Sequence, residues 1–320
     1  TTAIPSDAVV VMAALFSVTG RKPERACSFD FGFALGPRIN AAGRLADMTI
    51  GIECLLTDNP AHALELAQQL DAINHERRAI ESDMREQASA LAEKLFTNQD
   101  TPPAAISVFN ADFHEGVVGI VASRLKDTWH RPTFVFAASA ADGKSHELKG
   151  SGRSIAGFHL RDALDLVAKR HPGVLLRFGG HAAAAGCTVA REQFDVFAQA
   201  LAQVASEWLD AATLQRTIHT DGALPAQYRN TATAALLQQE VWGQGFDAPV
   251  FSEEMQVLQQ RLLKDKHLKL QLRHQGELVD AIWFNRTAPL PEHAHIAYRL
   301  DINEWNNQQR VQFIVEAAQE

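Results

Sequence analysis

The sequence predicts an α/β domain followed by an all-β domain, both attached to a helical N-terminal segment by one long connecting helix. Three observations predict this order. Residues 60–96 carry apolar side chains at helical spacing without a break. Residues 104–209 alternate short apolar runs with amphipathic helices, and residues 215–320 contain five strand-length segments between short polar breaks. We therefore expect four parts, residues 1–57, 58–97, 98–210 and 211–320.

The composition is that of a globular protein: 320 residues, of which 46% are hydrophobic and 21% charged. No apolar run approaches the roughly 20 residues that a membrane span needs, so we expect no membrane contact. Three cysteines without metal-ligand spacing fit a reducing cytoplasm. A net charge of −8 excludes a generally basic surface, so any nucleic-acid contact must be a local positive track. The start at Thr1, without methionine or secretory signal, indicates a fragment of a longer protein.

The segment 1–57 contains short helices and loops, too little to form a domain alone. The long helix follows over 60–96, with Asp58 or Asn59 as its cap and Pro60 in its first position. At 1.5 Å per residue it spans about 54 Å. A helix of that length links two bodies across a gap, and the charged segment 75–78 is expected on its solvated face.

A βαβ pattern begins after the break at Pro102-Pro103. The expected strands are 104–109, 133–138, 146–154 and 174–178, and the expected helices are 116–129, 158–170 and 191–209. The first of these helices is entered through His114-Glu-Gly and has Gly116 and Gly119 in its first turn. We expect unpaired N–H groups there, able to bind a phosphate.

The most unusual stretch is Arg177-Phe-Gly-Gly-His-Ala-Ala-Ala-Ala-Gly186. Gly179 and Gly180 permit positive φ and let backbone N–H groups turn toward a ligand, and His181 follows at that point. The alanines and Gly186 keep the next turn thin, which leaves room for an anion. The alternative is an ordinary Gly-Gly turn after a strand, with His181 buried and hydrogen-bonded in the core. The local pattern leaves both open.

Two further stretches place arginine beside glycine and a small polar residue: Gly36-Pro-Arg-Ile-Asn-Ala-Ala-Gly-Arg44 and Lys149-Gly-Ser-Gly-Arg-Ser154. Forked guanidinium donors, neutral donors and accessible backbone suit phosphodiester oxygens. Taken alone, Arg44 is better explained as a surface residue paired with a carboxylate. The presence of three such stretches in one chain favours a phosphodiester ligand.

The last hundred residues predict a small closed barrel of the oligonucleotide-binding (OB) kind. Its expected strands are 257–263, 267–273, 277–284, 295–300 and 311–315. Lys264, Lys266, Lys269 and Arg273 form a dense basic run, and Trp283, Phe284 and Trp305 are candidate stacking platforms for the bases of a single strand. The alternative is a solvated lysine face with the tryptophans in the core.

Five motifs, in order along nearly the whole chain, resemble those of the RecJ family, single-strand-specific exonucleases of the DHH phosphoesterase superfamily. They are Phe33-Ala-Leu-Gly-Pro-Arg-Ile-Asn-Ala-Ala-Gly-Arg44, His114-Glu-Gly-Val-Val-Gly-Ile-Val-Ala-Ser-Arg124, Lys149-Gly-Ser-Gly-Arg-Ser154, Phe178-Gly-Gly-His-Ala-Ala-Ala-Ala-Gly186 and Tyr298-Arg-Leu-Asp-Ile-Asn-Glu304. The sequence contains no Asp-His-His signature and no strand that ends in paired aspartates, which carry the family's metal site.

The resemblance implies that residues 1–57 end a DHH catalytic domain, 98–210 form the DHH-associated α/β domain and 211–320 form an OB-fold domain. It implies 5′→3′ hydrolysis of single-stranded DNA in repair and recombination, with Mn²⁺ or Mg²⁺ held by ligands outside this chain, so that the chain alone is expected to be inactive. His181 would position a phosphate without acting as the nucleophile. The substrate-binding residues that it implies are Arg38, Asn40, Arg44, His114, Ser151, Gly152, Arg153, Ser154, Gly179, Gly180 and His181.

Partners implied by the resemblance are single-stranded DNA, the single-stranded-DNA-binding protein and a repair helicase, and we expect a cytoplasmic monomer. Two other functions remain open. One is a phosphoesterase of dinucleotides or short oligonucleotides, which would not need a barrel that binds a single strand. The other is a metal-free nucleic-acid-binding module.

Overall fold

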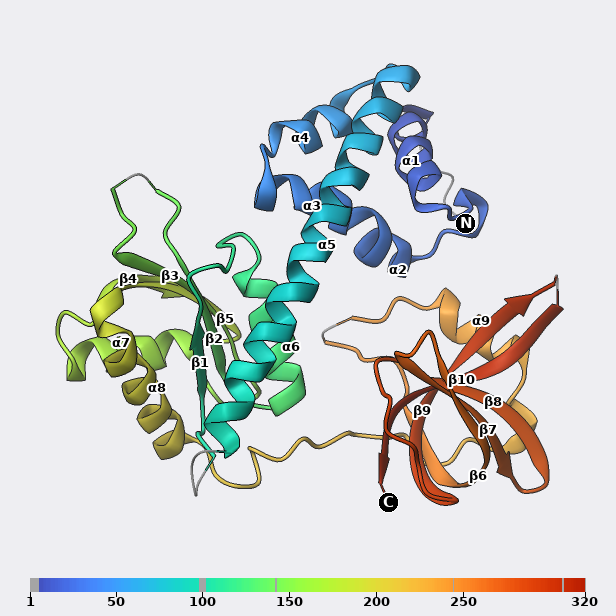
Figure 1. Ribbon diagram of the computed structural model, residues 1–320. Coiled ribbons are helices and arrows are strands. Elements are labelled where there is room, and N and C mark those ends of the chain that lie inside the picture. The colour runs from blue at the N-terminus through green and yellow to red at the C-terminus, as the bar shows by residue number, and fades with distance from the viewer. Residues whose placement is uncertain (1–5, 98–101, 142, 244, 307, 320) are drawn as a thin grey trace. The chain divides into compact units, whose positions relative to one another are not determined.

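A computed structural model describes residues 6–97, 102–141, 143–243, 245–306 and 308–319 (Figure 1). The chain divides into two compact units, Thr1–Arg216 and Thr217–Glu320. The first holds the helical segment, the long helix and the α/β domain, and the second holds a closed β-barrel. The predicted fold class is confirmed. Within the described ranges, no helix is long and apolar enough to cross a membrane.

The N-terminal helices pack against the first half of the long helix. They are α1 (Ser6–Thr19), α2 (Ser28–Asp30), a π-helical turn (Phe31–Leu35), α3 (Gly36–Leu45) and α4 (Thr49–Leu56), with a 3-10 turn at Pro23–Arg25. Leu15, Phe16 and Leu35 form their core together with Leu66 and Leu70 of the long helix. This packing anchors α3, which carries the predicted arginines, to the long helix.

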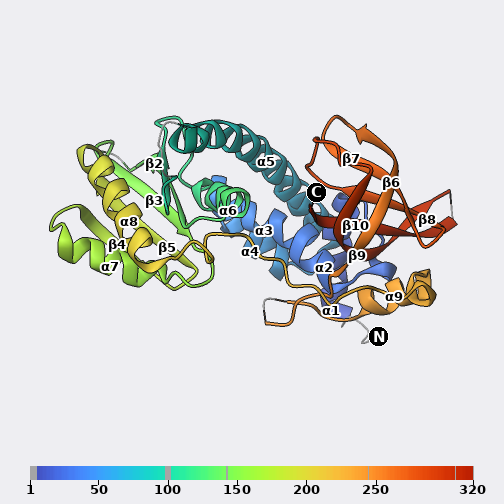
Figure 2. The same ribbon diagram turned by 90° about the horizontal axis from the view of Figure 1, so that it is seen from below.

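The long helix α5 (Pro60–Thr97) has 38 residues, which span about 57 Å. Asn59 caps it, because its Oδ1 accepts a hydrogen bond from the N–H of Ala61 at 3.0 Å. Its first half packs on the N-terminal helices, whereas its second half buries Met84 and Ala88 against the α/β domain. The helix therefore joins two separate cores, and Figure 2 shows it running from the N-terminal helices to the α/β domain.

The α/β domain contains a five-stranded sheet with the strand order β1-β2-β3-β5-β4. β1 and β2 are parallel, and the other neighbours are antiparallel. The strands are β1 (Ile106–Phe109), β2 (Thr133–Ala138), β3 (Glu147–Arg153), β4 (Leu175–Gly180) and β5 (Ala184–Ala190). The helices are α6 (Val118–Trp129), α7 (Leu160–Arg170) and α8 (Phe194–Trp208), and a 3-10 turn at Arg191–Gln193 precedes α8, where the sequence predicted continuous helix.

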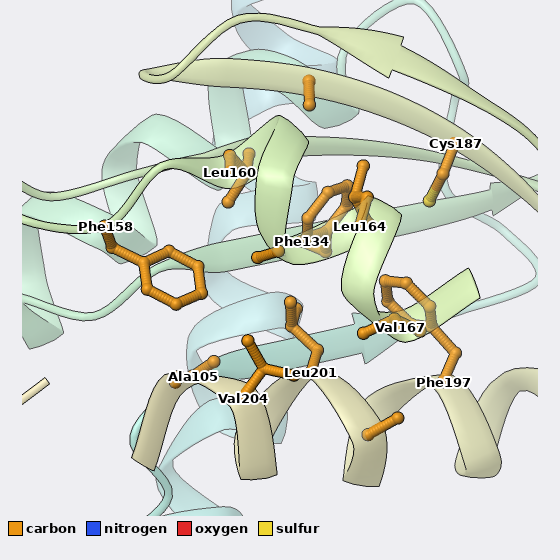
Figure 3. Close-up of a cluster of buried hydrophobic side chains, with 14 of the residues drawn as sticks. Ala105, Phe134, Phe158, Leu160, Leu164, Val167, Cys187, Phe197, Leu201 and Val204 are labelled. Atoms are coloured by element: carbon orange, nitrogen blue, oxygen red, sulfur yellow. The ribbon is translucent and has the colours of Figure 1, made fainter. Parts of the chain in front are cut away.

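The two faces of this sheet are covered differently. On one face α7 and α8 enclose the core drawn in Figure 3, in which Phe134 and Phe197 are fully buried. Gly150 and Gly152 of β3 face this core, since a Cβ on them would lie 2.3 Å and 2.4 Å from the rings of Phe136 and Phe134. On the other face α5 and α6 cover the first strands, whereas the helices that contact β4 and β5 are α7 and α8, on the opposite side.

The barrel closes through the strand order β10-β8-β7-β6-β9, with β9 pairing to β10. Its strands are β6 (Phe251–Leu263), β7 (His267–His274), β8 (Glu277–Trp283), β9 (His293–Trp305) and β10 (Gln308–Gln319). A 3-10 turn (Ala226–Tyr228) and α9 (Thr231–Gln239) precede β6, and α9 packs on β9 and β10. Alternate residues of β7 fill the interior, namely Leu268, Leu270 and Leu272.

Candidate functional site

Two of the three predicted anion-binding stretches lie side by side on the open face of the sheet. Side chains of directly paired residues in a sheet point to the same face. Ser151 of β3 pairs with Gly186 of β5, and Gly186 pairs with Gly179 of β4. Both glycines are exposed. They give the face a floor without side chains next to the hydroxyl of Ser151.

The turn between β4 and β5 borders this floor. Gly180 has φ of 142°, and a Cβ there would lie 2.5 Å from the carbonyl oxygen of Ala184, so the turn itself requires glycine. Gly179 differs, since a Cβ there would meet nothing within 4 Å. His181 donates its backbone N–H to Ala184 at 2.8 Å, and its side chain is exposed. The alternative of a buried core histidine is therefore wrong.

Arg153 and Arg44 bring two positive charges to the edge of this floor. The Nη1 of Arg153 donates to the Oγ of Ser151 at 3.1 Å and to the carbonyl of Gly152 at 2.8 Å. Burial lowers the pKa of Arg153, and the nearby charge of Arg44 lowers it further. Among the described residues neither arginine forms an ion pair with a carboxylate. Two adjacent, partly buried cations without a counter-ion favour an anionic ligand.

The start of α6 lies beside the two arginines, and its structure differs from the one that the sequence predicts. The helix begins at Val118 instead of Gly116, because residues 114–117 form a turn in which His114 accepts three backbone bonds. The N–H of Gly116 donates to its Nδ1 at 3.1 Å, and those of Val117 and Val118 donate to its carbonyl at 3.0 Å and 3.3 Å. The expectation of free amides is therefore wrong for Gly116, Val117 and Val118. The exposed ring of His114 retains Nε2–H as its donor.

Close packing joins this turn to the two arginines. A Cβ on Gly116 would lie 2.2 Å from the carbonyl oxygen of Arg44, whose Nη1 donates to the carbonyl of Gly116 at 3.2 Å. A Cβ on Gly119 would lie 2.9 Å from both the Oγ of Ser151 and the Nη2 of Arg153. Glycine at both positions allows α3, α6 and β3 to meet. Arg44, His114, Ser151 and Arg153 are thereby brought together.

Four other predicted residues lie apart from this cluster or are engaged within the fold. Arg38 donates from Nε to Asp71 of α5 at 2.8 Å and from Nη1 to the carbonyl of Ala34 at 2.7 Å. Asn40 is exposed on α3. Gly152 faces the core on the opposite side of the sheet, and Ser154 donates its hydroxyl to the carbonyl of Phe158 at 2.6 Å. Direct contact between these four residues and a ligand stays a prediction.

Comparison with known proteins identifies both domains. A family model for the DHHA1 domain matches residues 101–207, and a model for the RecJ OB domain matches residues 220–317. The single-stranded-DNA-specific exonuclease RecJ of Dickeya dadantii is 44% identical over 311 residues, 95% of this chain. The protein of the same name from Escherichia coli is 43% identical over the same share.

The chain belongs to the RecJ family. It spans 53% of the length of each of these two relatives. A crystal structure of RecJ in complex with Mn²⁺ from Thermus thermophilus covers 99% of this chain with a TM-score of 0.79 at 27% identity, and the match takes up 45% of that structure's chain. About half of the RecJ sequence is thus represented here, with the DHHA1 and OB domains in it.

The RecJ OB domain carries the second predicted group of cations. Lys264 and Lys266 lie in the turn between β6 and β7, and Lys269 and Arg273 follow on β7. Because Leu268, Leu270 and Leu272 alternate with them into the interior, Lys269 and Arg273 project outward. The four predicted cations therefore follow one hairpin of the barrel.

Sequence reasoning missed Arg261, which belongs to the same surface. It pairs in register with Lys269 across the β6–β7 hairpin and is exposed. The signal was present, because a tight turn at 264–266 fixes the register of the two strands. The predicted strand 257–263 contains this residue, and counting register across the turn places it opposite Lys269.

The candidate stacking residues of the barrel differ in their burial. Trp283 packs against the barrel core with Arg286 over its ring at 5.0 Å, which supports the core interpretation for this residue. Phe284 is exposed, and the His267 ring meets it edge-on at 5.2 Å. The side chain of Trp305 lies outside the described residues. Of Trp283 and Phe284, only Phe284 is exposed, and base stacking on its ring stays a prediction.

A metal centre does not fit the residues of this chain that the structure describes. No group of three His, Cys, Asp or Glu side chains in them converges in a way that would hold a metal ion. The groups that the described residues bring to the open face of the sheet are cationic side chains, hydroxyl groups and backbone without side chains.

Proposed function

We propose that this chain is the substrate-gripping part of a 5′→3′ exonuclease that hydrolyses single-stranded DNA in repair and recombination. The observation that carries the proposal is the pair Arg44 and Arg153 beside the open floor of Gly179 and Gly186, since neither arginine has a carboxylate partner in the part of the chain that the structure describes. The relatives are named as exonucleases specific for single-stranded DNA, and the Thermus structures are titled as complexes with Mg²⁺ or Mn²⁺. In the intact protein, residues outside this chain would hold such an ion.

In this proposal the sheet and the barrel hold different parts of the strand. Ser151 and Arg153 bind a phosphate over the glycine floor, Arg44 neutralises it and the Nε2–H of His114 donates to it from the α6 side, and His181 donates to it from the turn. These residues position the phosphate and stabilise negative charge, and none acts as nucleophile. Lys264, Lys266, Lys269 and Arg273 hold the backbone further along the strand.

The proposal is tested by binding of a 5′-phosphorylated single-stranded oligonucleotide at several salt concentrations. Gly179→Ala adds a methyl group to the floor, where it meets no protein atom within 4 Å, so we expect normal stability and an affinity reduced about tenfold or more. Gly32→Ala is the matched control, because its Cβ also meets nothing within 4 Å but lies far along the chain from the floor. Equal affinities for both variants would contradict the proposed site.

Catalysis is tested in parallel by manganese-dependent release of nucleotides. We expect none from this chain and release from the intact protein. In the intact protein His181→Ala should lower turnover on the order of 100-fold while the metal stays bound, which is the cost of one lost donor to developing charge. Normal turnover would rule out a positioning role for His181.

A metal-free nucleic-acid-binding module is the second candidate, favoured by the lack of a metal-ligand cluster in the described residues. If both this chain and the intact protein bind the oligonucleotide but release no nucleotides from it, the binding module would be established and the exonuclease ruled out. A phosphoesterase of short oligonucleotides would instead bind a dinucleotide as tightly as a longer strand. We further propose a cytoplasmic monomer that works beside the single-stranded-DNA-binding protein and a repair helicase.

A further inference from the structure

We propose a second phosphate subsite on the open face of the sheet, formed by Lys149, Thr188 and Arg177. It would take the phosphate next to the one held by Ser151 and Arg153, so that the face grips two successive nucleotides of a single strand. The inference rests on the proposed function and adds to it three residues that the motifs did not assign.

Strand register places these three residues in one row. Lys149 of β3 pairs with Thr188 of β5, and Thr188 pairs with Arg177 of β4. On its other side Lys149 pairs with Ala137 of β2, which is buried in the core beneath α6. The row therefore lies on the same face as Ser151, Gly186 and Gly179, two residues further along each strand.

One hydrogen bond within the row holds the charge of Lys149 over β5. The Nζ of Lys149 donates to the Oγ1 of Thr188 at 3.3 Å, and Thr188 is only 5% exposed. A buried hydroxyl thus holds the ammonium group above the strand. Arg177 is exposed on the neighbouring strand and brings a second cation to the row.

Both cations lack a carboxylate partner among the described residues, in contrast to others of this domain. Lys169 of α7 lies 2.5 Å from Asp165, and Arg170 lies 2.8 Å from Glu207. The next residue of β3 on the open face, Glu147, lies 3.8 Å from Lys144. The charge of the row is therefore available to an anion.

The spacing of the two rows fits a polynucleotide. Residues two apart on a strand are separated by about 7 Å, so the Lys149 row lies about that far from the Ser151 row. This is comparable to the separation of neighbouring phosphates along an extended single strand. Gly179 and Gly186 leave the surface beside the second row without side chains, so the backbone of the ligand can pass from one row to the next.

The test compares ligands with one and two phosphates, thymidine 5′-monophosphate and the 5′-phosphorylated thymidine dinucleotide. The variant Lys149→Met/Arg177→Met removes both charges and keeps the apolar stems. The control Arg161→Met/Lys169→Met removes two exposed charges from α7, on the opposite side of the sheet. Affinities are measured by calorimetry, and thermal unfolding midpoints verify the fold. Should the double variant not fold, Arg177→Met alone serves, since Arg177 is exposed.

We expect the row variant to bind the dinucleotide about tenfold more weakly or worse, with unchanged affinity for the mononucleotide. With a longer single strand, the slope of log affinity against log salt should fall by about 0.7 for each lost phosphate contact. Equal weakening for both ligands would assign the row to the first subsite and overturn the inference. So would an unchanged dinucleotide affinity, or equal losses in the α7 control. If the unaltered chain binds neither ligand, the proposed function fails first, and the inference fails with it.

Discussion

Glu253 is a buried carboxylate of the barrel, and replacing it tests how much its buried contacts stabilise the second unit. Its Oε2 lies 2.6 Å from the Nη2 of Arg229, which is also buried. Its Oε1 accepts from the hydroxyl of Tyr298 and from the backbone N–H of Leu224. Burial and the contact with Glu253 raise the pKa of Tyr298, so this hydroxyl stays protonated and donates.

We expect Glu253→Gln to destabilise the barrel by about 3 kcal/mol or more, because it leaves the charge of Arg229 buried without its partner. Glu254→Gln on the same strand is the matched control. Its side chain is exposed and pairs with His295, so we expect a change below about 0.5 kcal/mol. Hydrogen exchange of peptides from β6 to β10 in increasing urea measures both. Equal effects would mean that the Arg229 pair contributes no more than a surface pair.

The sequence allowed candidate site residues to be named from their types, but it did not show which residues they contact in the fold. Arg38 and Arg44 belong to one motif and had the same predicted role. In the fold Arg38 meets Asp71, 33 residues further on, whereas Arg44 meets Gly116 and lies near Arg153. Such partners depend on how α3 packs on α5 and α6. Local sequence contains no information of that kind, so the two arginines could not be separated beforehand.

At the scale of elements, one face of the paired strands β3 and β5 packs on the core and we propose that the other binds the ligand, and one glycine from each strand tests this division. A Cβ on Gly150 would lie 2.3 Å from the Phe136 ring, whereas a Cβ on Gly186 would find its nearest atom, the carbonyl oxygen of Gly150, at an ordinary 3.6 Å. We expect Gly150→Ala to cost about 1–3 kcal/mol of stability through overpacking. Gly186→Ala should leave stability unchanged and weaken oligonucleotide binding.

Urea unfolding and oligonucleotide titration of the two variants separate the two roles. The pair is informative because both glycines lie within adjacent strands of one sheet and receive the same methyl group. A stable Gly150→Ala variant would mean that the Phe136 ring moves aside easily. A Gly186→Ala variant with unaltered binding would show that the open face does not approach the ligand closely.

The elements themselves were largely predictable from periodicity and punctuation. The long helix was expected over 60–96 and occupies Pro60–Thr97, and the strand 133–138 was predicted at its observed bounds. Boundaries failed where turn chemistry outweighs periodicity, as at His114, whose ring and carbonyl hold a turn where the pattern predicted helix. The register across a short turn such as 264–266 could be predicted, but strand order and the register between distant segments could not, because they depend on how those segments pair. The row of Lys149, Thr188 and Arg177 becomes evident only from that register.

At the scale of the whole chain, a protein with a net charge of −8 has one proposed group of strand-binding cations in each compact unit, around Arg44 and Arg153 in the first and on the β6–β7 hairpin in the second. Seventeen residues without helix or strand, 209–225, connect the units. Arg131 donates to the carbonyl of Leu214 at 2.7 Å, and the N–H of Asp221 donates to the carbonyl of Val250 at 2.7 Å. Residues 215–220 lie between these two hydrogen bonds, and Arg216 in this stretch is exposed.

We therefore expect limited trypsin digestion to cut first after Arg216 and to release a barrel that stays folded. Arg216→Gln should remove this early cut, while Arg191→Gln, a control at the start of the 3-10 turn before α8, should not. Because each unit has its own core, hydrogen exchange of β6 to β10 should be the same before and after the cut. The released barrel should bind single-stranded DNA with a smaller salt dependence than the uncut chain, since it retains only the cations of the β6–β7 hairpin. A barrel that loses its protection on cleavage would show that the two units depend on each other for stability.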